Sequence, residues 1–410
     1  MGGPDWTRRY PSLVNIQRIR YEHFGGIVAT TSPVGLFWVD RQYLMNFGYH
    51  GGAAWSGDDP GYLRGPLEVE IHVTSACNLA CSLCYTDSGP GLGHVPYDRL
   101  VSYLDFAARV EALHVAFGGG EPLLHPRLLD LAAAARHRGL LPATTTNGTL
   151  VTPDWVARAA GLWARVNVSI DAGGGPRDPR AGLTRCLQAV TCLRSAGVDA
   201  GVNIVLTRQN LQQLPELFAM SAEAGADSVL VLRPKPVGRG GSVYAGLKPA
   251  ATQLSGLVSA LMDASSRASL PFHVDCALAP LVLSSECQRE TLDTLGAAGC
   301  IAGDLLLTVD SAGTVRPCSH TGLAAGHTRD YPAAWHVHPT LVQLRGRAER
   351  LGGRCQNCDV RDLCRGGCLA VNEHYGLSWE APDPDLSCSV RPHRVQPPPG
   401  AGRARDGVIR

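Results

Sequence analysis

The sequence predicts an α/β fold in which an open, partial barrel of six βα units lies between a short β-rich segment and a cysteine-rich segment. Short apolar β-type runs alternate six times with helix-period segments, which predicts the barrel. Cysteines gather where this alternation fades, which sets the C-terminal segment apart. The predicted parts are the β-rich segment 1–66, the partial barrel 67–265, the cysteine-rich domain 266–390 and a disordered tail 391–410 that is rich in proline and arginine.

The N-terminal segment differs in pattern from the barrel. Residues 14–39 read as a short antiparallel β-meander with a glycine pair, and a polar, glycine-rich connector follows at 48–65. The meander is either a docking element for a peptide or a cover for the edge of the sheet.

The barrel strands are expected at 69–74, 114–117, 142–146, 166–170, 202–206 and 228–232. Because each is followed by a helix-period segment, the strands are expected to be parallel, with right-handed crossovers and both sheet faces buried. Six units are too few for a closed eight-fold barrel, so an open one is predicted.

Two helices show clear boundary signals. Thr152 followed by Pro153 predicts the N-cap and first turn of the third barrel helix. In the fourth helix Val190 and Leu193 belong to one apolar face, and Gly197 predicts its end.

Composition restricts the partners. A net charge of +1 with 18% charged residues suggests neither a nucleic-acid nor a membrane footprint, so the partner is expected to be a small molecule or a peptide. The N-terminus lacks the apolar stretch of a signal peptide, and no run approaches the roughly 20 apolar residues of a spanning helix, which predicts a cytoplasmic protein. In a reducing compartment, 14 cysteines are expected to serve as metal ligands or in catalysis.

Cys77, Cys81 and Cys84 lie in the run CNLACSLC, directly after the first expected strand. Functional groups of a parallel sheet gather at the C-terminal ends of its strands. A 4Fe–4S cluster normally takes one thiolate per iron, so three thiolates leave one iron open. The C-x3-C-x2-C spacing at this place resembles the radical S-adenosylmethionine (SAM) family, and a zinc knuckle is the alternative interpretation. In that family the amino and carboxylate groups of SAM chelate the open iron, and an electron cleaves SAM to a 5′-deoxyadenosyl radical.

Further strand ends match the same family. GGGEP at 118–122 resembles the GGEP element, whose backbone binds the SAM amino group; a plain glycine turn is the alternative. The resemblance also implies SAM contacts at the ends of the third and fourth strands, and either Arg180 or Arg185 is a candidate partner for the SAM carboxylate, unless both are surface arginines. The resulting cofactor-binding candidates are Gly118, Gly119, Gly120, Glu121, Pro122, Thr146, Asn147, Ser169, Asp171 and Arg180.

The downstream cysteines resemble the seven-cysteine SPASM extension of radical SAM enzymes that modify peptides and proteins, and a pair of structural zinc sites is the alternative. The resemblance implies two auxiliary clusters, and therefore three 4Fe–4S clusters in all. One auxiliary ligand set would be Cys355, Cys358, Cys364 and Cys388, and the other Cys300, Cys318 and Cys368.

The second of these sets lacks a fourth thiol. Many family members carry a further ligand shortly after the first cysteine, but IAGDLLL follows Cys300 here. This cluster is therefore either open at one iron or completed from elsewhere, with Cys276 and Cys287 as candidates. Cys186 and Cys192, within the fourth helix, read as buried thiols.

The resemblance implies an oxidoreductase that removes hydrogen from a residue of a ribosomally made precursor peptide and oxidises it. A carbon–carbon, ether or thioether crosslink is the expected product, and epimerisation or decarboxylation is the alternative. It needs an electron donor such as flavodoxin or ferredoxin. The N-terminal meander is similar to the strands of PqqD-like recognition domains, and a separate leader-binding protein is the alternative for peptide recognition.

Three other functions compete with this one. Maturation of sulfatases is disfavoured because Ser319 stands where such maturases carry aspartate. Modification of a small metabolite would require no peptide. A non-catalytic iron–sulfur or zinc scaffold would not cleave SAM.

Overall fold

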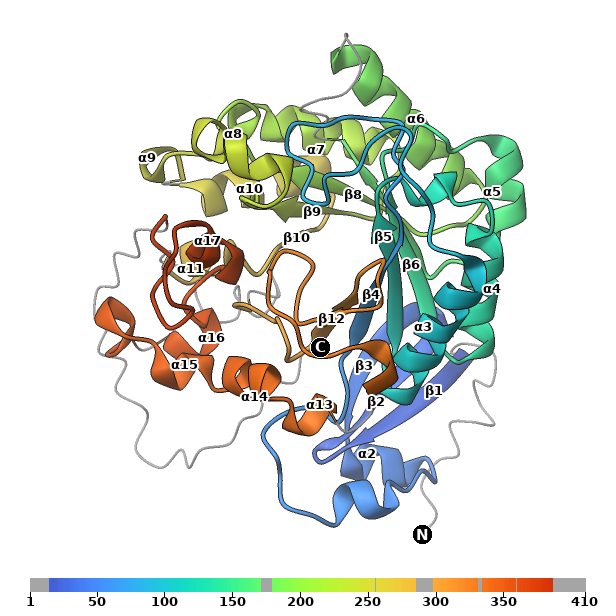
Figure 1. The fold of residues 1–410 in the computed structure, drawn as a ribbon. Helices are drawn as coiled ribbons and strands as arrows, with labels where there is room; N and C mark the ends of the chain where they lie inside the picture. The colour runs from blue at the N-terminus through green and yellow to red at the C-terminus, as the bar shows by residue number, and fades with distance from the viewer. Residues whose placement is uncertain are drawn as a thin grey trace.

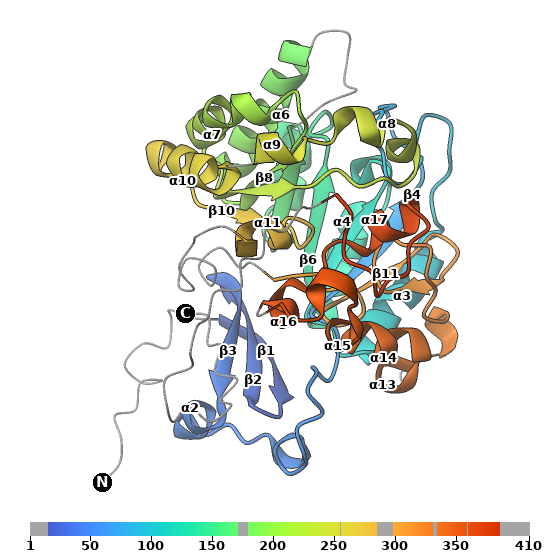
Figure 2. The same ribbon diagram turned by 90° about the vertical axis from the view of Figure 1, so that its left-hand side faces the viewer.

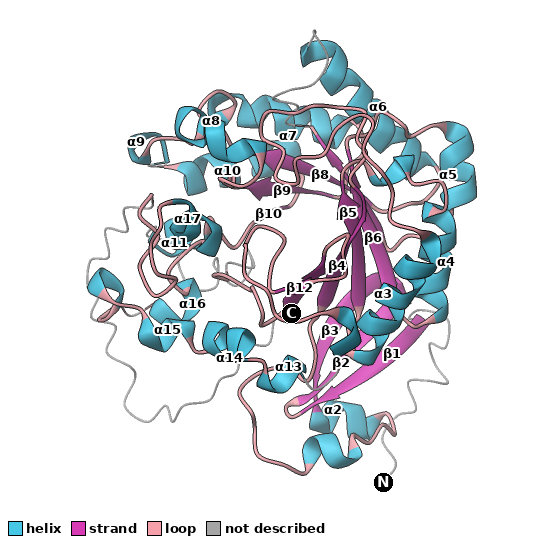
Figure 3. Ribbon diagram, in the orientation of Figure 1, coloured by secondary structure: helices cyan, strands magenta, loops and turns pink. Residues whose placement is uncertain are grey.

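The computed structural model describes residues 15–170, 179–254, 256–284, 298–330, 334–358 and 360–385. Its central feature, within this described part, is a nine-stranded sheet in the order β10-β9-β8-β7-β6-β5-β4-β11-β12. The sheet curves into an arc, and helices α3 to α7 cover its outer side (Figures 1 and 3). Asp171, Cys287 and Cys388 lie outside the described residues, as does the predicted tail.

The six predicted barrel strands are confirmed, and each pairs in parallel with the next. They are β4 (Glu68–Thr74), β5 (His114–Gly119), β6 (Leu141–Thr146), β7 (Arg165–Ser169), β8 (Ala200–Val205) and β9 (Ser228–Leu232). Helices on the outside connect them: α3 (Tyr97–Arg109), α4 (Leu128–His137), α5 (Pro153–Ala159), α6 (Pro179–Ser195) and α7 (Leu214–Glu223), with short 3-10 helices η2 (Pro122–Leu124) and η3 (Leu211–Gln213).

The sequence of β4 shows why the two faces of the arc differ. Val69, Ile71 and Val73 are 0% exposed and belong to the main apolar core beneath the helices. Glu70 and His72 alternate with them, so they point to the inner face, because successive side chains of a strand face opposite sides. The inner face of β4 is therefore polar, and it is also mostly buried, since the Glu70 and His72 side chains are 15% and 16% exposed.

The predicted helix boundaries are confirmed. The Thr152 hydroxyl accepts a hydrogen bond from the backbone N–H of Trp155 (3.2 Å) and caps α5. In α6, Val190 and Leu193 are 0% exposed, and the helix ends at Ser195. Gly197 follows with φ +72°, a left-handed conformation that favours glycine.

Residues beyond the sixth barrel strand extend the arc at both edges. After helices α8 (Arg239–Leu247), α9 (Ala251–Leu254) and α10 (Leu257–Ala268), β10 (Phe272–Val274) pairs in parallel with β9. At the other edge β11 (Leu306–Val309) pairs in parallel with β4, and β12 (Val315–Arg316) pairs antiparallel with β11. The predicted cysteine-rich segment is thus joined to both edges of the barrel, and the boundary at 265–266 stays a prediction.

The remaining C-terminal helices are short and lie across the open, inner side of the arc (Figure 1). They are α11 (Ala279–Ser284), α13 (Ala334–Val337), α14 (Pro339–Arg345), α15 (Arg347–Arg350), α16 (Arg361–Cys364) and α17 (Leu369–His374), with η4 (Thr328–Asp330) and η5 (Gly353–Cys355). None of the helices in the described ranges is long and apolar enough to cross a membrane.

The N-terminal meander is confirmed as a three-stranded antiparallel sheet, shown below the barrel in Figure 2. It consists of β1 (Asn15–Glu22), β2 (Gly25–Ser32) and β3 (Val34–Asp40), followed by α2 (Arg41–Asn46) and η1 (Gly52–Trp55). Ile27 of β2 packs with Leu113, Leu141 and Ala164, which lie at the N-terminal ends of β5, β6 and β7. The meander therefore lies at the end of the barrel opposite the C-terminal strand ends.

A buried ion pair fixes the meander in this place. The Arg20 guanidinium lies 2.7 Å from the Glu22 carboxylate, and both side chains are 2% exposed. Arg20 also donates to the backbone carbonyls of Pro66 (2.6 Å) and Glu111 (2.7 Å). These bonds join β1 to the segments that lead into β4 and β5.

Candidate functional site

The loop with Cys77, Cys81 and Cys84 leaves the C-terminal end of β4, where the sequence places it. Backbone hydrogen bonds fold it back on itself: Cys77 N–H donates to Gly89 O (3.1 Å), and Cys84 N–H donates to Cys81 O (3.3 Å). The three thiols are partly buried. Burial raises the pKa of the Cys77 thiol, and the charge of the neighbouring Cys84 adds to this rise.

The glycines of GGGEP allow the end of β5 to pack against the beginning of the cysteine loop. Gly120 N–H donates to Thr74 O (2.7 Å), and Glu121 N–H donates to Ala76 O (2.9 Å). A Cβ at Gly120 would lie 2.1 Å from Ala76 O, and Gly119 has φ +109°. Close approach of two backbones therefore accounts for these glycines, and their contact with SAM, like that of Gly118, stays a prediction.

Glu121 joins the second strand end to the third. Its side chain is 1% exposed and accepts hydrogen bonds from Thr146 Oγ1 (2.7 Å), Asn147 N–H (2.8 Å) and Leu123 N–H (3.0 Å). Burial raises the pKa of Glu121, and these three hydrogen bonds oppose the rise. Pro122 begins the short helix that Glu121 caps. GGGEP and the end of the third barrel strand, TTTNG at 144–148, thus form one connected unit.

Asn147 extends this unit to the cysteine loop. Its side-chain amide donates to Asn78 Oδ1 (2.9 Å), and Asn78 donates to Thr149 Oγ1 (2.7 Å). A hydrogen bond from the Asn147 side chain also lowers the pKa of Cys77, against the larger effect of burial. The structure therefore brings together Cys77 and the predicted residues of the second and third strand ends.

The predicted residues of the fourth unit are less fully placed. Ser169 ends β7 and pairs in register with Asn203 of β8. Asp171 is not among the described residues, and although α6 begins at Pro179, the side chain of Arg180 is not described. Arg185 is exposed on α6, as the surface interpretation expects.

Residues after β9 hold the cysteine loop from the other side, and the sequence interpretation missed them. Arg239 donates from Nε to Cys81 O (3.0 Å) and from Nη2 to Ser88 O (2.8 Å). Gly238 has φ +57°, and a Cβ there would lie 2.6 Å from Cys84 O. The run VGRGG after the sixth barrel strand was the available signal, because glycines at a strand end allow close backbone approach.

A polar cluster on the inner face connects the cysteine loop to the C-terminal segment, and it too was missed. Tyr85 donates to Glu70 Oε1 (3.0 Å), and His72 Nε2 lies 3.2 Å from the same oxygen. The Tyr85 and His320 rings lie 4.6 Å apart between centroids. Burial raises the pKa of Glu70, but hydrogen bonds and charges from His72, His320 and Ser319 outweigh burial and lower it to about 2. A carboxylate is thus kept ionised between the two cysteine-bearing parts.

Glu68 lies two residues before Glu70 on β4, and its pKa is shifted in the opposite direction. Burial raises its pKa from 4.5 to about 7, and the negative charge of Glu70 adds to the rise. A carboxyl group whose pKa is higher in the folded than in the unfolded chain stabilises the fold less as pH rises between the two values. Wild-type protein should therefore lose up to about 3 kcal/mol of stability between pH 4.5 and 7 through this group.

Glu68→Gln removes that pH dependence. The variant should match wild type near pH 4.5 and exceed its free energy of unfolding by up to about 3 kcal/mol at pH 8, in denaturant titrations followed by circular dichroism. Glu223→Gln, at an exposed position, is the control and should change stability by less than about 0.5 kcal/mol at either pH. If the difference in free energy of unfolding between Glu68→Gln and wild type does not vary with pH, the pKa of Glu68 is not raised in the folded protein.

The C-terminal segment brings Cys300, Cys318 and Cys368 together. Gly299 N–H donates to Leu363 O (2.7 Å), which places Cys300 beside the segment that leads to Cys368. Burial raises the pKa of Cys318, and the charges of Cys300 and Cys368 add to the rise. Cys318 is therefore within electrostatic range of both Cys300 and Cys368, the other two thiols predicted for this auxiliary cluster.

Of the other predicted set, Cys355 and Cys358 are adjacent, with a hydrogen bond from Cys358 N–H to Cys355 O (3.2 Å). Burial raises the pKa of Cys355, and the charge of Cys358 contributes. Cys364 is buried at the end of α16. Cys388 lies beyond the described residues, so the complete set stays a prediction.

The donor atoms fit iron–sulfur clusters. No three His, Cys, Asp or Glu side chains in the described ranges lie close enough together to hold a single metal ion. Each iron of a 4Fe–4S cluster takes its own thiolate, and soft thiolate ligands suit iron–sulfur clusters. Cys77, Cys81 and Cys84 would hold one cluster, with no competing carboxylate or imidazole in the C-x3-C-x2-C run.

Comparison with known proteins gives consistent matches. Residues 71–220 match the model of the Radical SAM superfamily. The mycofactocin maturase MftC of Mycobacterium ulcerans (strain Agy99) is 31% identical over 341 residues, which cover 79% of this chain and 88% of that protein. The AdoMet-dependent heme synthase of Nitratidesulfovibrio vulgaris (strain Hildenborough) is 27% identical over 352 residues, covering 80% and 94% of the two chains.

Among solved structures, Streptococcus suis SuiB bound to S-adenosylmethionine superposes with a TM-score of 0.69 at 20% identity, covering 92% of this chain and 99% of SuiB. SuiB bound to its precursor peptide SuiA gives 0.67 at 19% identity, covering 92% and 100%. At this level of identity the likeness concerns the fold.

Proposed function

Because this chain belongs to the radical SAM superfamily and is a SPASM-type radical SAM enzyme, we propose that it oxidatively modifies, and crosslinks, residues of a ribosomally synthesised precursor peptide. The observation that carries the proposal is the contact between the two cysteine-bearing parts. Tyr85 follows Cys84, His320 follows Cys318 by two residues, and their rings are in contact on the inner face of the barrel, with centroids 4.6 Å apart and planes tilted by 31°. A substrate on that face would lie between a radical source and an electron acceptor.

The cofactors of the proposal are SAM and three 4Fe–4S clusters. Bound SAM supplies a 5′-deoxyadenosyl radical that removes hydrogen from an unactivated carbon, which is cofactor chemistry. Cys77, Cys81 and Cys84 would hold the SAM-binding cluster. The C-terminal cysteines would hold two auxiliary clusters that accept the second electron of the oxidation.

This chain's own contribution is to orient the groups of the site. Asn147, Glu121 and the glycines fix the cysteine loop against two strand ends, so the SAM site is built on the rigid sheet. Glu70 is ionised and hydrogen-bonded to Tyr85. With a pKa of about 2 it is a weak base, so its proposed role is to hold Tyr85 in place, not to take up a proton.

The proposed partners are the precursor peptide and a one-electron donor such as flavodoxin or ferredoxin. Support for a peptide comes from relatives named mycofactocin maturase and PqqA peptide cyclase, and from SuiB, whose crystal structure was solved with its precursor peptide bound. The meander is one candidate for binding the leader part of the peptide, and a separate leader-binding protein is the other. The proposed location is the cytoplasm, where thiols stay reduced.

Anaerobically reconstituted and reduced protein should convert SAM to 5′-deoxyadenosine, quantified by liquid chromatography. The triple variant Cys77→Ala, Cys81→Ala, Cys84→Ala should lose this activity, because its SAM-binding cluster has no thiolate ligands. Cys192→Ala, on α6 away from the strand ends, should retain it. Mass spectrometry of a co-expressed precursor peptide should show a loss of two hydrogens per crosslink. A reduced, cluster-loaded protein that leaves SAM intact would contradict the enzyme assignment.

Modification of a small metabolite is the second candidate, because a relative of similar coverage is named an AdoMet-dependent heme synthase. The two candidates differ in one measurement. The peptide maturase should form 5′-deoxyadenosine faster with its precursor peptide and leave the peptide altered in mass. Product formation from a tetrapyrrole or other metabolite in the absence of peptide would favour the second candidate.

A further inference from the structure

The auxiliary cluster of Cys300, Cys318 and Cys368 poses a question of ligand number. Four irons ordinarily take four thiolates, and these residues supply three. The stretch after Cys300, IAGDLLL, contains no cysteine. The fourth ligand is therefore absent or comes from another part of the chain.

Cys276 lies at the C-terminal end of β10, the strand at one edge of the sheet. It follows β10 directly, and Asp275 N–H donates to Val231 O (3.0 Å), which continues the parallel pairing with β9. Leu278 N–H donates to Asp275 Oδ1 (3.1 Å) and closes a turn around Cys276. Since parallel strands end at one edge, Cys276 lies at the same edge as the SAM-cluster loop.

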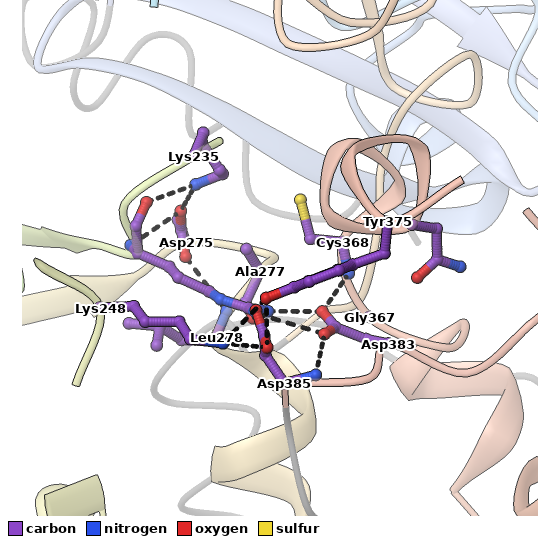
Figure 4. A network of polar contacts seen from close by, with 12 residues as sticks. Lys235, Lys248, Asp275, Ala277, Leu278, Gly367, Cys368, Tyr375, Asp383 and Asp385 are labelled. Carbon is purple, nitrogen blue, oxygen red and sulfur yellow. Dashed lines mark hydrogen bonds and ion pairs between the residues drawn. The ribbon is translucent and has the colours of Figure 1, made fainter. Parts of the chain in front are cut away.

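Packing on both sides of Cys276 joins it to the C-terminal cysteines. Ala277 is 0% exposed and belongs to one small buried cluster with Cys368 and Val371. Ala279 belongs to another with Cys364. In Figure 4 the Cys368 sulfur points away from Asp383.

The charges around Cys276 suit an anionic cluster. Cys276 is within electrostatic range of both Cys300 and Cys368, which are themselves neighbours. The Lys235 ammonium acts on Cys276 and Cys368 alike, and it is held by an ion pair with Asp275 and a hydrogen bond to Arg233 O (2.9 Å). The positive charge of this nearly buried ammonium complements the negative charge that a thiolate-ligated cluster would carry.

We propose that Cys276 is the fourth protein ligand of the auxiliary cluster held by Cys300, Cys318 and Cys368. Ligation replaces the S–H bond of Cys276 by an S–Fe bond and releases one proton, with no change in oxidation state. The inference rests on the auxiliary clusters of the proposed function and deepens that proposal. It implies a cluster closed to the substrate, which takes up an electron without binding the peptide.

The test uses full-length protein in which Cys77, Cys81 and Cys84 are replaced by alanine, so that only auxiliary clusters contribute to the spectrum. Cys276→Ala in this background should lose iron, or hold a cluster whose reduced electron paramagnetic resonance (EPR) signal shifts when imidazole is added. The background protein itself should not respond to imidazole, because it offers no open iron. Cys192→Ala is the matched thiol control and should behave like the background.

A serine variant separates ligation from folding. Cys276→Ser preserves the size of the side chain and supplies an oxygen ligand, so it should retain iron with a shifted EPR signal and reduction potential. The proposal would be refuted if both Cys276 variants kept the iron content and EPR signal of the background and did not respond to imidazole. It would also be refuted if Cys287→Ala, and not Cys276→Ala, lost iron or became sensitive to imidazole.

One comparison tells failure of this inference from failure of the proposed function. Cys300→Ala and Cys318→Ala should each remove iron if an auxiliary cluster exists there at all. If substitution of Cys300, Cys318 or Cys276 leaves the iron content unchanged, neither the auxiliary cluster nor its fourth ligand exists as proposed. If the iron content falls on substitution of Cys300 and Cys318 but not of Cys276, only the assignment of the fourth ligand is wrong.

Discussion

Gly120→Ala should reduce 5′-deoxyadenosine formation by about a hundredfold, because misplacing catalytic groups by about 1 Å costs that much in rate. The new Cβ would lie 2.1 Å from Ala76 O, directly before Cys77. The end of β5 must then move away from the cysteine loop, which breaks the hydrogen bonds from Gly120 to Thr74 (2.7 Å) and from Glu121 to Ala76 (2.9 Å). Anaerobic assays with equal protein, together with iron content, measure the effect.

Gly93→Ala is the matched control for this prediction. Gly93 lies in the loop between β4 and α3, and a Cβ there meets no atom within 4 Å. The variant should keep iron content and rate close to wild type. Equal losses in both variants would mean that the loop tolerates no change of any kind, and an active Gly120→Ala protein would contradict the close backbone approach.

Asp383→Asn should lower the free energy of unfolding by about 3 kcal/mol, since it breaks a buried ion pair and leaves the Arg233 charge with only the longer contact to Asp385 (3.4 Å). Arg233 is bonded through both of its terminal nitrogens to Asp383, with one distance of 3.2 Å, and the two side chains are 6% and 2% exposed (Figure 4). Asp383 also accepts a hydrogen bond from Cys368 N–H (3.0 Å). Iron should therefore be lost from the auxiliary site before the SAM site.

A surface pair provides the comparison. Arg350 and Glu380 lie 3.1 Å apart, but their side chains are 42% and 49% exposed. Glu380→Gln should change stability by less than about 1 kcal/mol and leave the iron content unaltered. Both variants remove one acidic charge from the same C-terminal segment, so denaturant titration of the pair isolates the effect of burial. A Glu380→Gln effect as large as that of Asp383→Asn would contradict this account.

Features with local signals were predictable from the sequence. The barrel strands follow from short apolar runs and the helix boundaries from single residues such as Thr152 and Gly197, because these signals act within a few positions. The position of CNLACSLC at a strand end needed only the order of elements. β10 was missed because it has three residues, and its identity as a strand depends on pairing with β9.

The polar inner face of β4 was overlooked although the sequence carried a usable signal. Glu70 and His72 alternate with valine and isoleucine on a strand, and this pattern marks a polar face.

Features that depend on contacts between distant segments were not predictable. The ring contact between Tyr85 and His320 joins segments far apart in sequence, and no local pattern encodes it. Spacing likewise gave no basis for choosing between Cys276 and Cys287, whereas the packing of Ala277 with Cys368 places the first of them.

The position of the meander would set a minimum length for any substrate that binds to it. Ile27 packs against the N-terminal ends of the barrel strands, and the cysteine loop lies at their C-terminal ends. β4 has 7 residues, and at about 3.3 Å per residue it separates the two ends by about 23 Å. A chain anchored at the meander would thus need at least about seven extended residues between its anchor and the residue that reacts. A substrate with a shorter spacer would bind but would not be modified, because its reacting residue would not reach the cysteine loop.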